Sequence, residues 1–400
     1  MTSPPPDDTV TGDAERDGDG VVADDVGGIA DGEAPADPAE PMLTPIVGAV
    51  PVAPVPFEGS DARIHLVYEL RLTNYFPGPV TIGGVEVLDA GTGEAVASVD
   101  DVAERLKPAG VSGLSAELAA GQAGTLFLHV ILEPDAAIPA ELTHEMDVSL
   151  GPDEALTERL APTTVDARTL PVLGPPMIGE GYLAADGCCD ATRHRNALLA
   201  VDGQTYLAQR FAIDYEQLDG DGRIYVGDPA DPESYLIYGD EALAVADGTV
   251  VVALDGLDEA VPGAFPEITL AEADGNSVVL DIGDGFFVNY AHFQPGSLRV
   301  EVGDEVRKGD VLGLVGNSGR SIAPHLHLHV MDSASPLKSE GLPYVMEPFE
   351  ITGQGASTED FDRAEAEGIP LETVPGLEPT EHTDQMVLDQ SIVTFRDTES

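Results

Sequence analysis

Apolar and polar residues alternate in segment 63–75 (RIHLVYELRLTNY), which predicts a β-strand. Ile64, Leu66, Tyr68 and Leu70 recur there at every second position. Because successive side chains of a strand point to opposite faces, these four side chains share one face of the strand.

The same kind of pattern continues over residues 124–134 (GTLFLHVILEP) and 141–150 (ELTHEMDVSL), with Gly and Pro turn signals between the segments. Several short strands separated by turns favour a β-sandwich. The phrase LVYELRLTN also resembles strands of immunoglobulin-like accessory domains. We therefore expect an immunoglobulin-like β-sandwich accessory domain over residues 41–165.

A second strand-rich pattern is clearest in residues 286–330, where Gly-Asp, Lys-Gly and Asn-Ser-Gly turns separate short apolar runs. A stretch rich in Pro and Gly, residues 171–181, separates this second pattern from the first. We therefore assign residues 166–185 to a linker and residues 186–352 to a second, β-rich domain. With the sandwich, this makes the chain mainly β.

The two ends of the chain differ from both patterns. Residues 1–40 combine acidic residues with Gly and Pro and have no apolar periodicity, so we expect a disordered acidic arm. Residues 353–400 are also acidic and are expected to form a C-terminal tail. The apolar end of that tail, QMVLDQSIVTF, is long enough to add a strand.

Charge excludes some classes of partner. The chain has 73 acidic and 18 basic residues, a formal net charge of −55. Nucleic acid and anionic membranes would be repelled, so we expect neither as a partner. The acidic excess indicates either a halophilic protein, adapted to high salt, or simply a strongly acidic protein with acidic tails.

Export and cross-linking signals are sparse. No apolar run of about 20 residues is present, so no membrane insertion is expected. The first residues (MTSPPPDDTVTGD) lack the basic and apolar regions of a signal peptide. Cys188 and Cys189 are adjacent, and neighbouring cysteines seldom bridge, because a disulfide prefers Cα atoms about 4.4–6.8 Å apart. We therefore expect no disulfide framework.

Candidate chemistry lies in the histidines. His325, His327 and His329 project from one face of a predicted strand, and His292 stands upstream in the phrase YAH. Neighbouring imidazoles on one face can share a small site, in which one ligates a metal and another moves protons. In a chain with nine histidines, this concentration predicts a functional site.

The stretch GDEVRKGDVLGLVGNSGRSIAPHLHLHV, preceded by YAH, resembles the core of the lysostaphin/LytM-type zinc metallopeptidases, the M23 family. The resemblance covers roughly residues 188–332 and implies a β-rich peptidase domain that binds Zn²⁺. It also implies that His325 is the general base, that His327 is a zinc ligand, and that His292 steadies the tetrahedral intermediate.

Part of this stretch, VGDEVRKGDVLG, also occurs in biotinyl and lipoyl carrier domains. Such a carrier needs a modifiable lysine at the tip of a hairpin, and Lys308 stands in the wrong phrase for that role. We therefore reject the carrier interpretation.

One position departs from the family pattern. An HxxxD motif normally supplies the first zinc histidine and the zinc aspartate. Asp214 matches that aspartate, but Arg210 stands where the histidine belongs, and a guanidinium has only donors to offer. His194 is our leading replacement ligand; His329 is a second candidate, and Cys188 or Cys189 is a third.

The length of the turn near residues 201–203, between two predicted strands, decides which face of its strand His194 occupies. If residues 201–203 form a three-residue turn, His194 comes to lie opposite Arg210, on the side of the metal. A two-residue Asp-Gly turn instead sets His194 opposite Phe211, on the other face.

Two functions are consistent with these residues. The first is a zinc-dependent endopeptidase that cleaves peptides, such as peptidoglycan cross-bridges, by a metal-activated water. The alternative is a degenerate M23-type domain that has lost its metal, in which Arg210 pairs with Asp214 and the domain binds or activates another hydrolase. The resemblance suggests the cell envelope or an extracellular location, although no signal peptide is visible.

Overall fold

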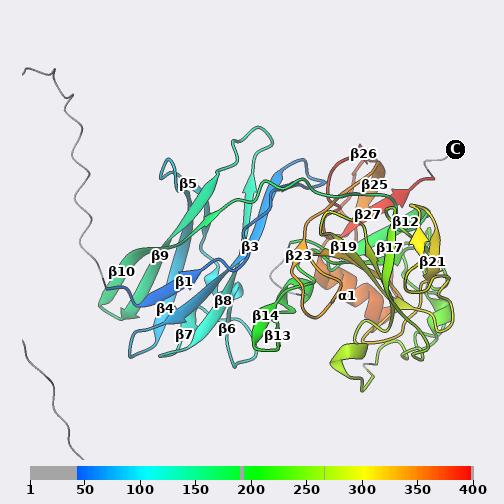
Figure 1. Cartoon of the computed structure of the whole chain (residues 1–400), viewed down its shortest axis with the longest axis horizontal. Coiled ribbons are helices and arrows are strands. Elements are labelled where there is room, and N and C mark those ends of the chain that lie inside the picture. Colours follow the sequence, from blue (N-terminus) through cyan, green and yellow to red (C-terminus); the bar gives the residue numbers. More distant parts are fainter. Residues whose placement is uncertain (1–42, 190–192, 265, 398–400) are drawn as a thin grey trace, which may run out of the picture. The chain divides into compact units, whose positions relative to one another are not determined.

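The computed structural model describes residues 43–189, 193–264 and 266–397. The predicted arm over residues 1–40 lies outside the described residues. The described part of the chain is mainly β, as predicted, and its strands form three large sheets and three small pairs (Figure 1). It contains no helix long and apolar enough to cross a membrane.

The first two sheets lie within residues 46–164 and have five strands each. One sheet consists of β1 (Ile46–Ala49), β2 (Phe57–Glu58), β3 (Ile64–Asn74), β6 (Leu106–Pro108) and β8 (Ala123–Leu132). The other consists of β4 (Val80–Asp89), β5 (Ala95–Val99), β7 (Glu117–Leu118), β9 (Glu141–Gly151) and β10 (Glu154–Thr164). A short 3₁₀ helix, η1 (Val102–Glu104), follows β5.

These two sheets share one core, which makes them a sandwich. Leu66, Tyr68 and Leu70 of β3 are buried there, together with Ile82 and Val85 of β4 in the facing sheet. The alternation in the sequence therefore identified the inward face of β3. The immunoglobulin-like character of this sandwich stays a prediction.

The third sheet has eleven strands and carries the candidate site. Ten of them lie in the order β20 (Glu305–Val306), β17 (Gly248–Leu254), β18 (Asn276–Asp281), β19 (Phe287–Phe293), β22 (Leu326–Met331), β15 (Ile213–Gln217), β12 (Gly179–Ala185), β27 (Ser391–Phe395), β25 (Phe349–Gln354) and β26 (Thr380–His382). The eleventh, β23 (Gly341–Leu342), pairs with β22. A separate core, with Tyr215, Tyr290 and Leu328 among its members, is buried against this sheet.

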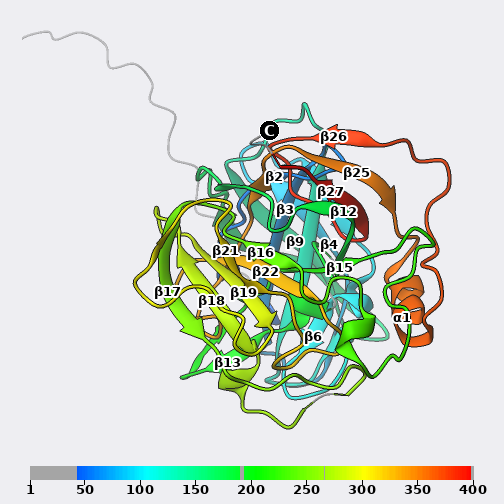
Figure 2. The ribbon, with the colours of Figure 1, turned by 90° about the vertical axis from the view of Figure 1, so that its right-hand side faces the viewer.

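The chain beyond residue 352 is built into this sheet. β27 lies between β12 and β25, and Figure 2 shows these three strands together. The only α-helix of the described residues, α1 (Thr358–Glu367), begins after Ser357, whose hydroxyl accepts a hydrogen bond from the Asp360 amide, and ends at Gly368 with a positive φ. The sheet thus extends past the end that we assigned to the second domain.

Smaller elements connect these parts. Three strand pairs are β11 (Val172–Leu173) with β24 (Val345–Met346), β13 (Leu199–Val201) with β14 (Gln204–Tyr206), and β16 (Glu241–Leu243) with β21 (Val311–Leu314). Three further 3₁₀ helices are η2 (Arg193–Asn196), η3 (Pro232–Ser234) and η4 (Leu270–Glu272).

The hairpin near His194 has the two-residue Asp-Gly turn, one of the two that we considered, but this turn does not place His194. Val201 pairs with Gln204, so the turn has two residues, and Asp202 and Gly203 both have positive φ. The pairing ends at Leu199, however, and His194 lies in η2 rather than in a strand. Neither turn register therefore decides where His194 points.

The two cysteines also differ from expectation, because Cys188 and Cys189 are joined by a disulfide. The peptide bond between them is cis, and their Cα atoms are 3.0 Å apart. A bond between neighbours links no distant parts of the chain, so the fold has no disulfide framework among the described residues.

Candidate metal and catalytic site

Two strands of the large sheet bring the predicted metal residues together. Asp214 on β15 is the direct cross-strand partner of His327 on β22. Nδ1 of His327 lies 2.8 Å from Oδ1 of Asp214. Cross-strand neighbours have Cβ atoms about 5 Å apart, so the antiparallel register itself fixes this contact.

His194 reaches the same carboxylate from η2. Its Nε2 lies 3.2 Å from Oδ2 of Asp214. On the other side of the ring, Nδ1 donates to the backbone carbonyl of Asp186, at 2.8 Å. A carbonyl only accepts, so the proton of a neutral His194 is on Nδ1 and Nε2 keeps its lone pair.

His329 supports His327 from the same strand. Nε2 of His327 lies 2.9 Å from Nδ1 of His329, which leaves Nδ1 of His327 facing Asp214. The Nε2 atom of His329 is buried and has no hydrogen-bond partner among the described residues. His329 therefore lies behind the candidate ligand. It is outside both groups of three that share His327 and could hold a metal, namely His194, Asp214 and His327, and His292, His325 and His327.

His325 and His292 stand beside these residues with a common arrangement. Nδ1 of His325 donates to the carbonyl of Ala323 at 2.7 Å, and Nδ1 of His292 donates to that of Ser318 at 2.7 Å. The two ring centroids are 4.7 Å apart. Nε2 of His325 lies 3.3 Å from Oδ1 of Asp214. Each ring thus keeps Nε2 available on the side away from its carbonyl.

A close backbone approach holds His292 in place. His292 has a φ of +69°, which few non-glycine residues adopt, and its amide donates to the carbonyl of Asp274. Gly275 also has a positive φ, and a Cβ there would lie 2.4 Å from the carbonyl carbon and oxygen of Ser318. Only glycine therefore fits this position without displacing Ser318, whose carbonyl orients His292.

Charges in the site are strongly coupled. Burial would raise the pKa of Asp214, but the facing imidazoles of His194, His325 and His327 hold it well below its usual range. Burial would lower the pKa of His194, yet Asp214 raises it to about 9. Burial lowers the pKa of His292 well below its usual value. One carboxylate therefore serves several nitrogens, an arrangement suited to a cation at its centre.

The site opens into a cavity of about 500 Å³. Phe361, Asp362 and Glu365 of α1 line one wall, and Asp186 and Glu216 lie on the same lining. Burial and the neighbouring Glu365 raise the pKa of Glu216 well above its usual value. Burial, together with Asp214, raises the pKa of Asp186 to about 6. This wall is acidic, and such carboxyl groups can accept hydrogen bonds from a bound peptide.

Arg210 points away from Asp214. Its Nη2 atom lies 2.9 Å from Glu69 and 2.7 Å from Glu340, and Nη1 donates to the carbonyl of Gly341 at 2.8 Å. Its side chain is almost fully buried in these contacts. The arrangement in which Arg210 pairs with Asp214 and displaces the cation is therefore absent.

The donor set fits zinc. Ligand atoms of His194, Asp214 and His327 all lie within 4.8 Å of one another. Two imidazoles and a carboxylate are ligands that zinc accepts, and catalytic zinc sites present three protein ligands and one open position. Cys189, our third candidate ligand, groups instead with His65 and His129.

Several contributors escaped the sequence analysis. Asp186 acts through its backbone carbonyl, which no side-chain motif reveals. Glu216 and Glu365 lie in segments that we interpreted as strand and tail. Glu69 lies in the sandwich, and its partners could not be inferred without knowing which side of β3 is covered.

Comparisons with known proteins agree with the geometry. Residues 236–339 match the family model described as peptidase family M23. The chain is 39% identical over 90 residues to Endolysin 2638A of Staphylococcus phage 2638A, which covers 20% of this chain and 18% of the endolysin. It is 30% identical over 95 residues to the peptidoglycan DD-endopeptidase ShyA of Vibrio cholerae, which covers 21% and 22% respectively. The chain thus spans about a fifth of the length of these curated relatives.

Two solved structures also align with parts of the chain. The catalytic domain of lysostaphin from Staphylococcus simulans aligns at 21% identity over 41% of this chain and 88% of that domain, with a TM-score of 0.22. A mutant catalytic domain of the prophage-encoded M23 protein EnpA from Enterococcus faecalis aligns at 19% identity over 43% and 92%, with a TM-score of 0.24.

Proposed function

We propose, from the premise that residues 236–339 match peptidase family M23, that this chain is a zinc-dependent endopeptidase. The observation that carries the proposal is the convergence of His194, Asp214 and His327 on the lining of one cavity. The missing histidine of the HxxxD pattern is replaced by His194, which comes from a different element. Arg210 serves a structural role elsewhere.

Nε2 of His194, a carboxylate oxygen of Asp214 and Nδ1 of His327 would hold the zinc ion. When bound, zinc lowers the pKa of a coordinated water to about 7 and polarises a carbonyl group. The hydrogen bonds of the other ring nitrogens suit this assignment. Nδ1 of His194 is bonded to the Asp186 carbonyl, and Nε2 of His327 is bonded to His329.

His325 would act as the general base. Its Nδ1 proton is committed to the Ala323 carbonyl, so its Nε2 atom can take a proton from a water in the site. Nε2 of His292 faces the same space. Burial disfavours a proton on this Nε2 atom in the resting site, but the negative charge that develops on the scissile carbonyl would favour it, and the protonated ring would then donate a hydrogen bond to that oxyanion.

The substrate that we propose is a peptide, and in particular a peptidoglycan cross-bridge. The names of two relatives, an endolysin and a peptidoglycan DD-endopeptidase, support this class of substrate. A cell-envelope or extracellular location follows from the same proposal. The acidic wall of Asp186, Glu216 and Glu365 would favour substrates that offer amide or amino donors.

The alternative of a metal-free binding or activator module receives less support. It rested on an ion pair between Arg210 and Asp214, and Arg210 is instead held by Glu69 and Glu340. A binding module would also have no need for three imidazoles directed at one buried carboxylate.

Zinc content and hydrolysis test the proposal together. Purified protein should contain one zinc per chain by elemental analysis and should release new amino groups from purified peptidoglycan. His194→Ala should lose both. His382→Ala should lose neither, because His382 of β26 is hydrogen-bonded to Thr380 and Gln385 and lies outside the proposed ligand set. Zinc-free protein that binds peptidoglycan without cleaving it would establish the binding module instead.

A further inference from the structure

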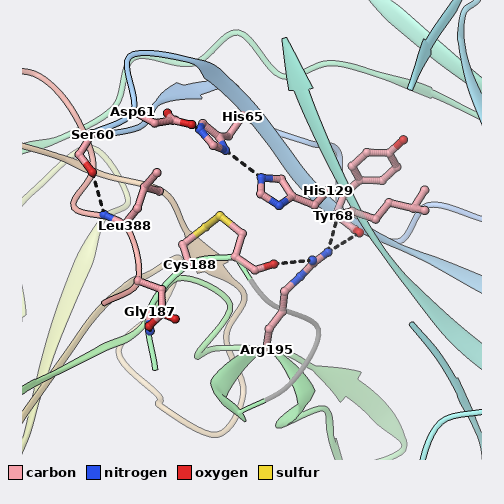
Figure 3. The surroundings of a disulfide bond; sticks show 12 residues. Ser60, Asp61, His65, Tyr68, His129, Gly187, Cys188, Arg195 and Leu388 are labelled. Carbon is pink, nitrogen blue, oxygen red and sulfur yellow. Dashed lines mark hydrogen bonds and ion pairs between the residues drawn. A yellow bond between two sulfur atoms is a disulfide. The ribbon is translucent and has the colours of Figure 1, made fainter. Parts of the chain in front are cut away.

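A second cluster of potential metal ligands combines two histidines of the sandwich with Cys189 and is separate from the proposed catalytic site. His65 on β3 and His129 on β8 lie diagonally across two paired strands. Nδ1 of His65 lies 2.8 Å from Nε2 of His129. Ligand atoms of these two histidines and of Cys189 all lie within 4.8 Å of one another. Figure 3 shows both rings beside the Cys188–Cys189 disulfide.

The surroundings of His65 match those of a metal ligand. On the side away from His129, its Nε2 donates to Oδ1 of Asp61 at 2.9 Å. A carboxylate on the far nitrogen fixes the tautomer and orientation of a ligating imidazole in many metal sites. Phe57 stacks on the ring at 5.2 Å, and His65 is only 2% exposed. The ring is therefore held with Nδ1 directed toward His129 and the cysteines.

His129 is also suited to this role. Its ring stacks on that of His65 with the two centroids 5.1 Å apart, and its Nε2 atom faces Nδ1 of His65. Between tetrahedral zinc ligands the nitrogens stand about 3.3 Å apart, so the two rings need to separate by only about half an ångström.

The charge around the cluster is balanced. Arg195 donates to the carbonyl of Cys189 at 3.3 Å, and a nearby cation favours a thiolate, which is the metal-binding form of cysteine. The guanidinium itself is paired with Glu69, at 3.2 Å. A thiolate at Cys189 and the carboxylate of Asp61 would together offset the charge of a divalent cation.

We propose that His65, His129 and Cys189 form a second zinc site, which is available only when the Cys188–Cys189 disulfide is reduced. A small dithiol supplies the reduction: its two thiols close to a disulfide, and two electrons and two protons pass to the cysteine sulfurs. Cys189 then gives up its thiol proton to solvent as its sulfur binds zinc. In the oxidised chain both sulfurs are bonded to each other, and the site lacks its thiolate.

Two serine variants separate this proposal from a simple effect of losing the disulfide. Cys188→Ser and Cys189→Ser both abolish the disulfide, but only the first leaves the proposed ligand in place. Each variant is made together with His194→Ala, which removes a ligand of the proposed catalytic zinc, and is titrated with Co²⁺. The chain with Cys188→Ser should bind about one Co²⁺ and show a thiolate-to-cobalt charge-transfer band, and adding His65→Ala should abolish both.

The chain with Cys189→Ser should bind no Co²⁺ and show no band. Equal binding by both serine variants, binding by neither, or a band that survives His65→Ala would overturn the proposal. The His194→Ala chain with both cysteines provides a further check, because it should bind zinc only after dithiol treatment. Metal content of the oxidised chain with His194 intact reports on the catalytic site alone, so the two proposals can fail independently.

Discussion

Arg210 and Glu69, 141 residues apart in the chain, are joined in a buried ion pair, with Nε of Arg210 3.0 Å from Oε2 of Glu69. Glu69 also accepts from Arg195 at 3.2 Å, and Arg195 donates to the carbonyls of Tyr68 and Leu128. Arg195 directly follows His194. A strand of the sandwich therefore anchors the 3₁₀ helix that presents a proposed zinc ligand.

Glu69→Gln should destabilise the protein and weaken zinc binding. The amide would leave Arg195 buried without a carboxylate, and breaking a buried charge network typically costs roughly 3–5 kcal/mol. Urea unfolding measures the stability, and competition with a chelator measures zinc affinity. Glu86→Gln, on an exposed face of β4, is the matched control and should change stability by less than about 0.5 kcal/mol. Unchanged zinc affinity in Glu69→Gln would show that η2 is positioned without Glu69.

His325→Ala should retain zinc and lose turnover. His325 is absent from the proposed ligand set, and removing a general base typically lowers rates by about 100-fold to 10,000-fold. Elemental analysis and a peptidoglycan hydrolysis assay measure the two properties separately, with His327→Ala as the comparison that should lose zinc. Equal zinc loss in the two variants would make His325 a ligand rather than a base.

Gly275→Ala should reduce turnover while zinc content stays the same. The new Cβ would collide with the Ser318 carbonyl and shift the acceptor that orients His292. Gly285→Ala is the matched control, because Gly285 also has a positive φ but has no atom within 4 Å of its added Cβ. Both variants carry the left-handed strain of about 1–2 kcal/mol, and only Gly275→Ala should impair hydrolysis. Equal rates of hydrolysis in the two variants would contradict the proposal that the orientation of His292 matters for catalysis.

The free energy of unfolding should decrease as the pH is lowered, because His144 titrates at a lower pH in the folded chain than in the unfolded chain. This histidine is fully buried between Tyr68 and the Ala161 carbonyl, and burial lowers its pKa to about 4. The unfolded chain, with a histidine pKa of about 6.5, therefore binds more protons than the folded chain between pH 6.5 and 4. Over that window the wild type should lose roughly 3 kcal/mol that His144→Gln does not lose. Urea unfolding at several pH values measures this difference, and parallel pH curves would contradict it.

High salt should stabilise the fold. With a net charge of −55, like charges repel one another across the surface, and salt screens this repulsion with a Debye length of about 3 Å at 1 M. The melting temperature should therefore rise between low and molar KCl. A melting temperature that does not change would show that the acidic residues are not an adaptation to salt.

The sequence revealed most where local pattern and structure coincide. Alternation identified the inward face of β3, and the spacing of His325 and His327 indicated a shared site. The position of His194 could not be predicted from strand register. The hairpin beside it ends at Leu199, and His194 lies in the 3₁₀ helix η2 instead of a strand. The other face of β3, with Val67 and Glu69, is also buried, and Val67 packs in the core of the eleven-stranded sheet. No local sequence pattern predicts burial by residues so distant in the chain.

The place of β27 in the large sheet has a consequence for how the protein is made. β12 pairs on one side with β15, which carries Asp214, and on the other with residues 392–395 of β27. During synthesis from the N-terminus, β12 and β15 leave the ribosome long before β27 does. A nascent chain that has not reached residue 395 therefore has an open sheet edge beside the strand of Asp214, and this edge is free to pair with other strands. The order of synthesis thus delays completion of this sheet until β27 has emerged.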